Sequence, residues 1–236
     1  MINSIYSRLN YYRPLRWSNL TSESYRHLIL LLFWPIFGIL FFLVERGSIT
    51  SDFHIVHCAL DDIIPFCEYF LIPYLFWFIF ILGIMIYSLL FDIDAFKNFM
   101  YYTIITYSIT ILIYFLYPTA QELRPVSFER TNIFTYLIGI FYELDTNTNV
   151  CPSLHVIGSV AVMLAAWNSR HFSTAAWRAL FLTATLLISI STVFLKQHSV
   201  IDVFAALPVC FLAYKAVYGE KFKAYITSMK AYGRAQ

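Results

Sequence analysis

Long, nearly uncharged apolar runs constrain this chain more than any other feature. The first, LILLLFWPIFGILFFLV at 28–44, is apolar on every side. A helix needs about 20 such residues to cross a bilayer, whereas a membrane β-strand alternates over about 10 residues. The chain is 60% hydrophobic and 13% charged, with a mean hydropathy of +0.67, which is unusual for a soluble domain. The sequence therefore predicts an all-α integral membrane protein.

Six runs are long enough to span, and they lie at 28–44, 70–91, 99–117, 150–167, 179–195 and 200–217. The apolar segment 131–144 is too short to span, so we expect it at the interface or as a re-entrant lid. We interpret residues 1–27 as a basic and aromatic juxtamembrane segment, 28–218 as a six-span membrane domain, and 219–236 as a basic cytoplasmic tail.

The distribution of positive charge predicts the orientation. With the N-terminus in the cytoplasm, the cytoplasmic side holds all 16 lysines and arginines except Arg46, Arg124, Arg130 and Lys196. This bias predicts that both termini are cytoplasmic, in a multi-pass protein of the cell or inner membrane. No basic cluster suits nucleic acid. Cys58 and Cys67 fall on the outer side, where they either pair or remain free thiols.

Three polar clusters fall on that same outer side. They are YPTAQELRP after the third run, CPSLH at the start of the fourth, and KQHSVID between the fifth and sixth. Polar groups beside apolar spans are costly and usually functional. Because the clusters gather at one depth, they favour a single site over a transport pathway.

His198 and Asp202 are four residues apart at the start of a predicted helix, so their side chains are within hydrogen-bonding reach. An aspartate costs roughly 2.5–3.5 kcal/mol at the centre of a span, and less near its end, so it needs a partner. A histidine oriented by a carboxylate suits a nucleophile. A structural ion pair of Asp202 with Lys196 or Arg124 is the alternative.

The remaining polar residues complete a possible phosphoryl-transfer site. Arg124 and Lys196 carry positive charge for phosphate oxygens, and Ser153 lies where a helix N-terminus offers N–H groups to an anion. His155 is placed to protonate the departing oxygen of a lipid phosphate. Taken singly, His155 is equally typical of an interfacial histidine, and Arg124 of a snorkelling arginine.

These motifs resemble those of the type 2 phosphatidic acid phosphatase superfamily, whose usual patterns are K-x6-R-P, P-S-G-H and S-R-x5-H-x3-D. The matching residues are Arg124 and Pro125, then Pro152, Ser153 and His155, then Ser191, His198 and Asp202. The resemblance implies a six-helix bundle with the site at the outer ends of the third to sixth spans. It also implies a mechanism without metal or other cofactor, through a phosphohistidine on His198.

Three positions depart from the superfamily pattern. Tyr117, Leu154 and Thr192 stand where the family has lysine, glycine and arginine. We interpret Lys196, two residues before His198, as restoring part of the missing positive charge. YPT, PSLH and the stretch from DDIIPF to IPY resemble the inositol phosphorylceramide synthase-like branch and its bacterial relatives. The resemblance covers the chain from about residue 61 to residue 217.

The motifs favour a membrane enzyme that hydrolyses a lipid phosphate or diphosphate, of the phosphatidic acid or polyprenyl type, on the extracytoplasmic side. A phosphotransferase that passes the phospho group to an alcohol is the alternative. We expect hydrolysis because the sequence shows no polar pocket for a headgroup alcohol. Two remote alternatives are a non-catalytic transporter and a metal-dependent hydrolase with His155, His198 and Asp202 as ligands.

Overall fold

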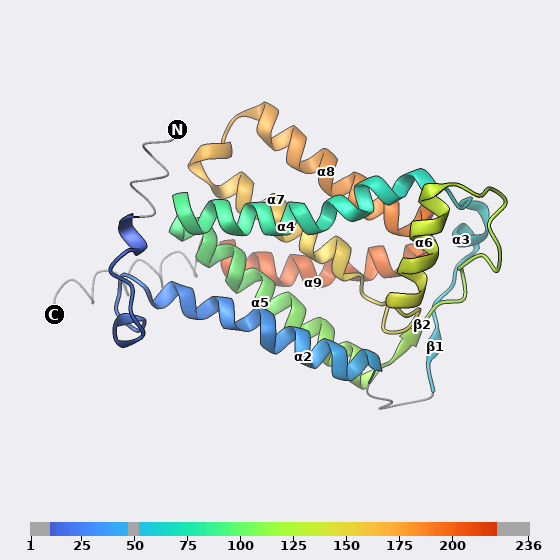
Figure 1. The fold of residues 1–236 in the computed structure, drawn as a ribbon, viewed down its shortest axis with the longest axis horizontal. Coiled ribbons are helices and arrows are strands. Elements are labelled where there is room, and N and C mark those ends of the chain that lie inside the picture. Colours follow the sequence, from blue (N-terminus) through green and yellow to red (C-terminus); the bar gives the residue numbers. More distant parts are fainter. Residues whose placement is uncertain (1–9, 47–51, 221–236) are drawn as a thin grey trace.

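The structure is a computed structural model that describes residues 10–46 and 52–220. Its long helices form one bundle (Figure 1). They are η2 (Arg26–Leu32) continued by α2 (Phe33–Arg46), then α4 (Leu71–Phe91), α5 (Ile93–Leu116), α7 (Leu154–Asn168), α8 (Ala175–Phe194) and α9 (Val200–Tyr218). Each lies on one of the predicted apolar runs, with its ends displaced by a few residues.

Five helices within the described residues are long and apolar enough to cross a membrane. They are Arg26–Arg46, Glu68–Phe91, Ile93–Leu116, Ala175–Phe194 and Val200–Tyr218. The prediction of a multi-pass helical membrane protein is confirmed in this form. The remaining predicted span is α7, which has only 15 residues, or about 22 Å of helix. It begins later than predicted because Pro152 and the extended N-cap residue Ser153 precede it.

Helix α7 lies at the centre of the bundle, where it packs against α4, α5, α8 and α9. Small residues, including Gly158, Ala161 and Ala165, are buried along it. Small residues let membrane helices approach closely. A Cβ added at Gly158 would lie 2.7 Å from Tyr107 Oη and 3.0 Å from Trp77 Nε1, so a larger residue requires its neighbours to move.

Short elements gather at one end of the bundle. Strand β1 (His54–Ile55) pairs in parallel with β2 (Thr119–Ala120). Helix α3 (Ala59–Ile63) follows β1, and η3 (Glu68–Phe70) leads into α4. Segments that are far apart in the sequence therefore meet at this end of the molecule (Figure 1).

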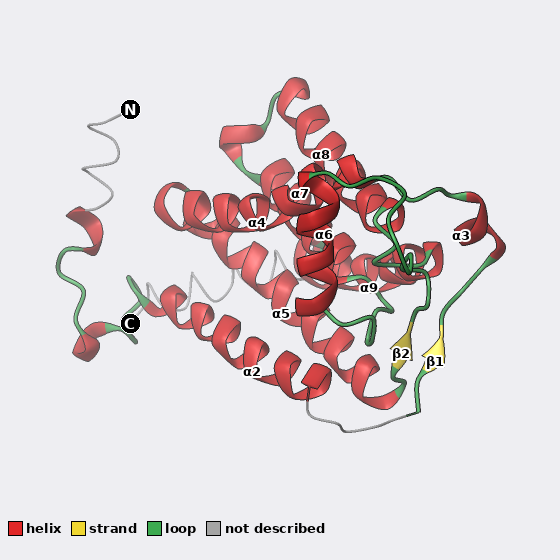
Figure 2. Cartoon of the chain, turned by 45° about the vertical axis from the view of Figure 1, so that its right-hand side comes forward, coloured by secondary structure: helices red, strands yellow, loops and turns green. Residues whose placement is uncertain are grey.

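Helix α6 (Ile133–Leu144) is the short apolar segment that was expected at the interface or as a lid, and it stands across the ends of the bundle helices (Figure 2). The Asn132 side chain caps it by accepting bonds from two backbone N–H groups of the first turn. Ile138 is 1% exposed and packs in a cluster with Tyr74 and Leu195. The helix therefore covers this end of the bundle.

The first described residues and the end of α9 lie at the opposite end of the bundle (Figure 1). This end also carries η1 (Trp17–Asn19) and η4 (Arg170–Phe172). Trp17 is 93% exposed, as suits a residue at lipid headgroups. Residues 1–9 of the predicted juxtamembrane segment, and 221–236 of the predicted basic tail, lie outside the described residues.

All four cysteines are free thiols. Of the two alternatives for Cys58 and Cys67, the structure therefore has the unpaired one.

Candidate active site

His198 and Asp202 form the expected pair at the start of α9. His198 Nδ1 lies 3.1 Å from Asp202 Oδ2, which also accepts a hydrogen bond from the backbone N–H of Ser199 at 2.9 Å. Asp202 is fully buried and His198 is 7% exposed. Ser199 is the N-cap residue of α9. Because Asp202 holds Nδ1, the Nε2 atom of His198 is the nitrogen left for chemistry.

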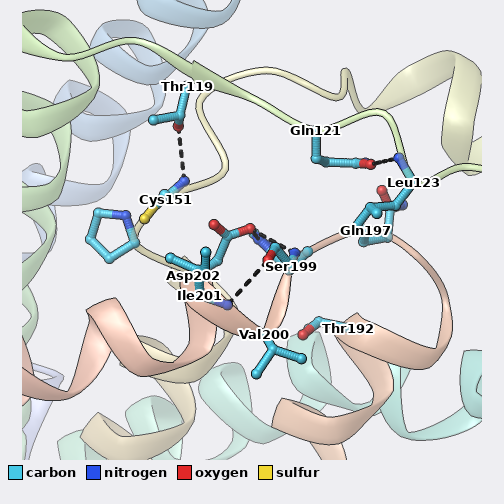
Figure 3. A network of polar contacts seen from close by, with 12 residues as sticks. Thr119, Gln121, Leu123, Cys151, Thr192, Gln197, Ser199, Val200, Ile201 and Asp202 are labelled. Atoms are coloured by element: carbon cyan, nitrogen blue, oxygen red, sulfur yellow. Dashed lines mark hydrogen bonds and ion pairs between the residues drawn. The ribbon is translucent and has the colours of Figure 1, made fainter. Parts of the chain in front are cut away.

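Backbone contacts bring the three predicted polar clusters together. The Ser153 N–H donates to the carbonyl oxygen of Asp202 at 3.1 Å. The Cys151 N–H donates to Thr119 Oγ1 at 3.1 Å (Figure 3). The Ser153 bond joins the CPSLH cluster to KQHSVID, and the Cys151 bond joins CPSLH to YPTAQELRP. The three clusters therefore lie together at one end of the bundle.

His155 lies in the first turn of α7, between two aromatic rings. Its ring centroid is 4.6 Å from that of Tyr74 and 4.5 Å from that of Trp77, and 5.6 Å from that of His198. Neither of its ring nitrogens has a hydrogen-bond partner within the described part of the chain. The imidazole thus packs against aromatic rings of α4, and neither of its nitrogens is used by the described residues.

A cavity of about 50 Å³, the inner cavity, adjoins both histidines. Its lining includes His155, His198, Gln197 and Asp145. Tyr74 Oη donates to Asp145 Oδ2 at 3.4 Å. Burial raises the pKa of the Asp145 carboxyl above its ordinary value, although the neighbouring His198 and Arg124 oppose this shift. Sequence reasoning missed Asp145 because it precedes a polar loop with no recognisable motif.

Arg124 lies next to this cavity, but its guanidinium is largely occupied. Nη1 donates to the carbonyl oxygens of Tyr142 and Asp145, and Nη2 donates to that of Thr146 and to Gln197 Oε1. The guanidinium also stacks on the Tyr142 ring, 4.6 Å from its centroid. Arg124 thus caps the C-terminal end of α6, and its Nε has no partner among residues 10–46 and 52–220.

The Lys196 ammonium is bonded to backbone carbonyl oxygens of the α3 segment. Its Nζ donates to the carbonyl oxygens of Asp61 at 2.6 Å and Ile64 at 2.5 Å, and its backbone is left-handed with φ of 55°. Burial lowers the pKa of the Lys196 ammonium, while Asp61 and Asp62 oppose the shift. The alternative ion pair of Asp202 with Lys196 or Arg124 does not form, because both cations bond elsewhere.

Asp61 is a second residue that sequence reasoning missed as part of this end. Its carboxylate accepts hydrogen bonds from Ser199 Oγ at 2.6 Å and from the Val200 N–H at 2.8 Å. Burial raises the pKa of Asp61, but these bonds and those from Cys58 outweigh burial and hold the pKa below its ordinary value. The two adjacent aspartates in DDIIPF are the only signal in the sequence, and they do not indicate which residues donate hydrogen bonds to Asp61.

A larger cavity of about 320 Å³, the outer cavity, lies beside the inner one. Its polar lining comes from the ends of α2 and α5 and from the loop after α6, and comprises Glu45, Arg46, Tyr114, Thr146, Asn147, Thr148 and Asn149. The sequence shows no polar pocket for a headgroup alcohol, whereas the fold brings these polar residues together around one cavity. Sequence reasoning missed most of these residues because Glu45 and Arg46 lie at the end of the first apolar run, whereas the TNTN loop lies about 100 residues later. The two segments come together only in the folded chain.

No group of three or more His, Cys, Asp or Glu side chains that would hold a metal ion is found within residues 10–46 and 52–220. His155, His198 and Asp202 do not form such a group. Comparisons of the chain with models of known protein families, with characterised proteins and with solved structures find no match.

Proposed function

We propose that this protein is a membrane enzyme that transfers the phosphoryl group of a lipid phosphate or diphosphate to water. One observation supports this most: an imidazole oriented by a buried carboxylate faces a second imidazole, with the ring centroids of His198 and His155 5.6 Å apart. A nucleophile and a proton donor on opposite sides of one phosphorus atom need this kind of arrangement.

The reaction takes two steps in this proposal. His198 Nε2 attacks phosphorus while the P–O bond to the lipid alcohol breaks, and protonated His155 gives its proton to the departing oxygen. His155 then takes a proton from water, whose oxygen attacks the phosphohistidine, so the P–N bond breaks and phosphate leaves. Asp202 keeps the His198 proton on Nδ1 and stabilises the imidazole as it gains positive charge.

Two buried donors are available for the phosphate oxygens. Ser153 Oγ and Arg124 Nε have no hydrogen-bond partner in the described residues, and Ser153 is fully buried at the start of α7. Helix N-termini favour anions. Lys196 contributes indirectly in this proposal, because its ammonium is bonded to two carbonyl oxygens of the α3 segment.

The proposed site lies on the extracytoplasmic side of a cell or inner membrane, with six spans and both termini in the cytoplasm. The described ends of the chain lie at the end of the bundle opposite the site (Figure 1), and the positive-inside bias places those ends in the cytoplasm. In this proposal the short α7 is the fourth span along the chain and brings the number of spans to six. The longer helices α4, α5, α8 and α9 pack around it.

Transfer to an alcohol instead of water is a second candidate, and the outer cavity favours it. This cavity adjoins the inner cavity and has a polar lining, so a polar group other than water has room beside the two histidines. Helix α6, which covers this end, is placed to limit the access of water.

Purified protein in detergent, assayed on short-chain phosphatidic acid for released phosphate and for new lipids, tests the proposal. We expect His198→Ala to abolish turnover and any acid-labile phosphoprotein, and Asp202→Asn to lower kcat by about 10²–10⁴-fold, as when a histidine loses its orienting carboxylate. Chelators should leave the rate unchanged. The control is His171→Ala, which changes an exposed histidine outside the site. Substantial turnover by His198→Ala would rule out the mechanism.

A further inference from the structure

The outer and inner cavities adjoin each other, because five residues line both: Glu45, Tyr114, Thr146, Thr148 and Asn149. Two of these residues carry an oxygen with no hydrogen-bond partner in the described residues, namely Glu45 Oε2 and Asn149 Oδ1. Both oxygens are buried, and Asn149 is only 5% exposed. Native structures rarely leave such acceptors unpaired, so these two indicate a ligand.

The protein holds Asn149 in a fixed position. Its backbone is left-handed, with φ of 51°, a conformation that asparagine tolerates better than most residues. Its backbone N–H donates to Thr119 O, and its Nδ2 donates to Val44 O at 3.3 Å. The amide nitrogen is therefore used within the protein, and the amide oxygen is left for the cavity.

The unpartnered atoms determine what the ligand must offer. Asn149 Oδ1 and an ionised Glu45 can only accept hydrogen bonds, so the ligand must donate them. The lining of the outer cavity contains the carboxyl group of Glu45 and one guanidinium, that of Arg46, whose Nη2 already donates to the Leu144 carbonyl oxygen of α6 at 2.6 Å. Phe53 also lines the outer cavity, and aromatic faces attract cations. A donating cation fits this lining better than a neutral alcohol or an anion.

We propose that the outer cavity binds a primary ammonium group, held by Glu45 and Asn149, of a ligand whose phosphate lies in the inner cavity. The position of the phosphate rests on the proposed function, whereas the ammonium site stands on the cavity itself. Two sources have this chemistry: the headgroup of an aminophospholipid, and a free amine that enters beside the phosphohistidine.

Calorimetric titration of the purified full chain in detergent tests the site. The amine probes are ethanolamine and dihexanoylphosphatidylethanolamine. The matched probes, called neutral because an uncharged alcohol replaces the ammonium group, are glycerol and dihexanoylphosphatidylglycerol. We expect the wild type to prefer the amine of each pair, and Glu45→Gln to weaken amine binding by about tenfold or more. Asn149→Gly, which keeps the left-handed backbone, should also weaken it. Glu143→Gln, which changes an exposed acid outside both linings, should not.

The two probes separate the sources. Binding of ethanolamine itself would support the site with a free amine as ligand, whereas binding of the aminophospholipid alone would support it with a lipid headgroup. Equal affinity for the neutral probes, or unchanged amine binding in Glu45→Gln, would overturn the proposal. His198 lines the inner cavity but not the outer one, so the His198→Ala variant should still bind amines although it does not turn over. A failure of the proposed catalysis is therefore seen in turnover, and a failure of the ammonium site is seen in amine binding.

Discussion

Replacing Asp61 with alanine would remove the carboxylate that joins α3 to the start of α9. Asp61 is 1% exposed, and it accepts hydrogen bonds from Ser199 Oγ, the Val200 N–H and the Cys58 N–H at 2.6, 2.8 and 2.8 Å. Each buried donor left unpaired costs about 1–3 kcal/mol, and the three costs overlap because the donors share one acceptor. We therefore expect Asp61→Ala to lower the free energy of unfolding by about 3–5 kcal/mol.

Thermal unfolding of the purified protein in detergent measures this loss, which should lower the midpoint by roughly 10 °C in a chain of this size. Asp62→Ala is a matched control in the same helix. The Asp62 side chain is 66% exposed and pairs with the exposed His57, so its removal should cost less than about 1 kcal/mol. Similar midpoints for the two variants would refute the assignment of Asp61 as the bond between α3 and α9.

The same carboxylate predicts a dependence on pH. Because its hydrogen bonds hold the pKa of Asp61 below the ordinary value, Asp61 stabilises the protein above the pKa of an unfolded carboxyl. This contribution is lost as the pH falls through the lower pKa of the folded state. The wild type should therefore lose more stability on acidification than Asp61→Asn, whose side chain does not titrate.

Two further substitutions test α6 and the role of Lys196. Ile138→Ser places a hydroxyl at a position that is 1% exposed and should destabilise the protein by about 2–5 kcal/mol. Ile140→Ser, at a position that is 37% exposed, should cost less than about 1 kcal/mol. Equal losses of unfolding free energy in the two variants would contradict the packing of α6. Lys196→Met leaves two carbonyl oxygens unpaired, so it should lower the unfolding free energy by about 1–3 kcal/mol with little change in KM. A large rise in KM without loss of stability would instead show that Lys196 binds phosphate.

The apolar runs were sufficient to predict where the long helices lie, because burial in a bilayer requires length and apolarity and both are visible in the sequence. The start of α7 was less predictable. The apolar residues begin at Val150, but the helix begins at Leu154 after the extended N-cap residue Ser153, because a proline disfavours the helical conformation in the residue before it, here Cys151.

The site was predictable where its geometry is local. His198 and Asp202 are four residues apart at the N-terminal cap of α9, where Asp202 Oδ2 bonds to both His198 Nδ1 and the N–H of the N-cap residue Ser199. Arg124 and Lys196 were assigned to phosphate from their charge, but charge does not show which acceptor a cation reaches, and here backbone carbonyls take most of their donors. The position of Glu45 beside the TNTN loop depends on the packing of distant segments, which no local pattern encodes.

The indole of Trp77 touches the imidazole of His155, with ring centroids 4.5 Å apart. Tryptophan emission is sensitive to the charge of an imidazole in ring contact, so its brightness would follow each gain or loss of a proton at His155. The chain has five tryptophans. To isolate the signal of Trp77, the other four would be replaced by phenylalanine, namely Trp17, Trp34, Trp167 and Trp177. The protein thus contains its own optical probe at the proposed proton donor, and stopped-flow fluorescence could time that proton transfer without a label.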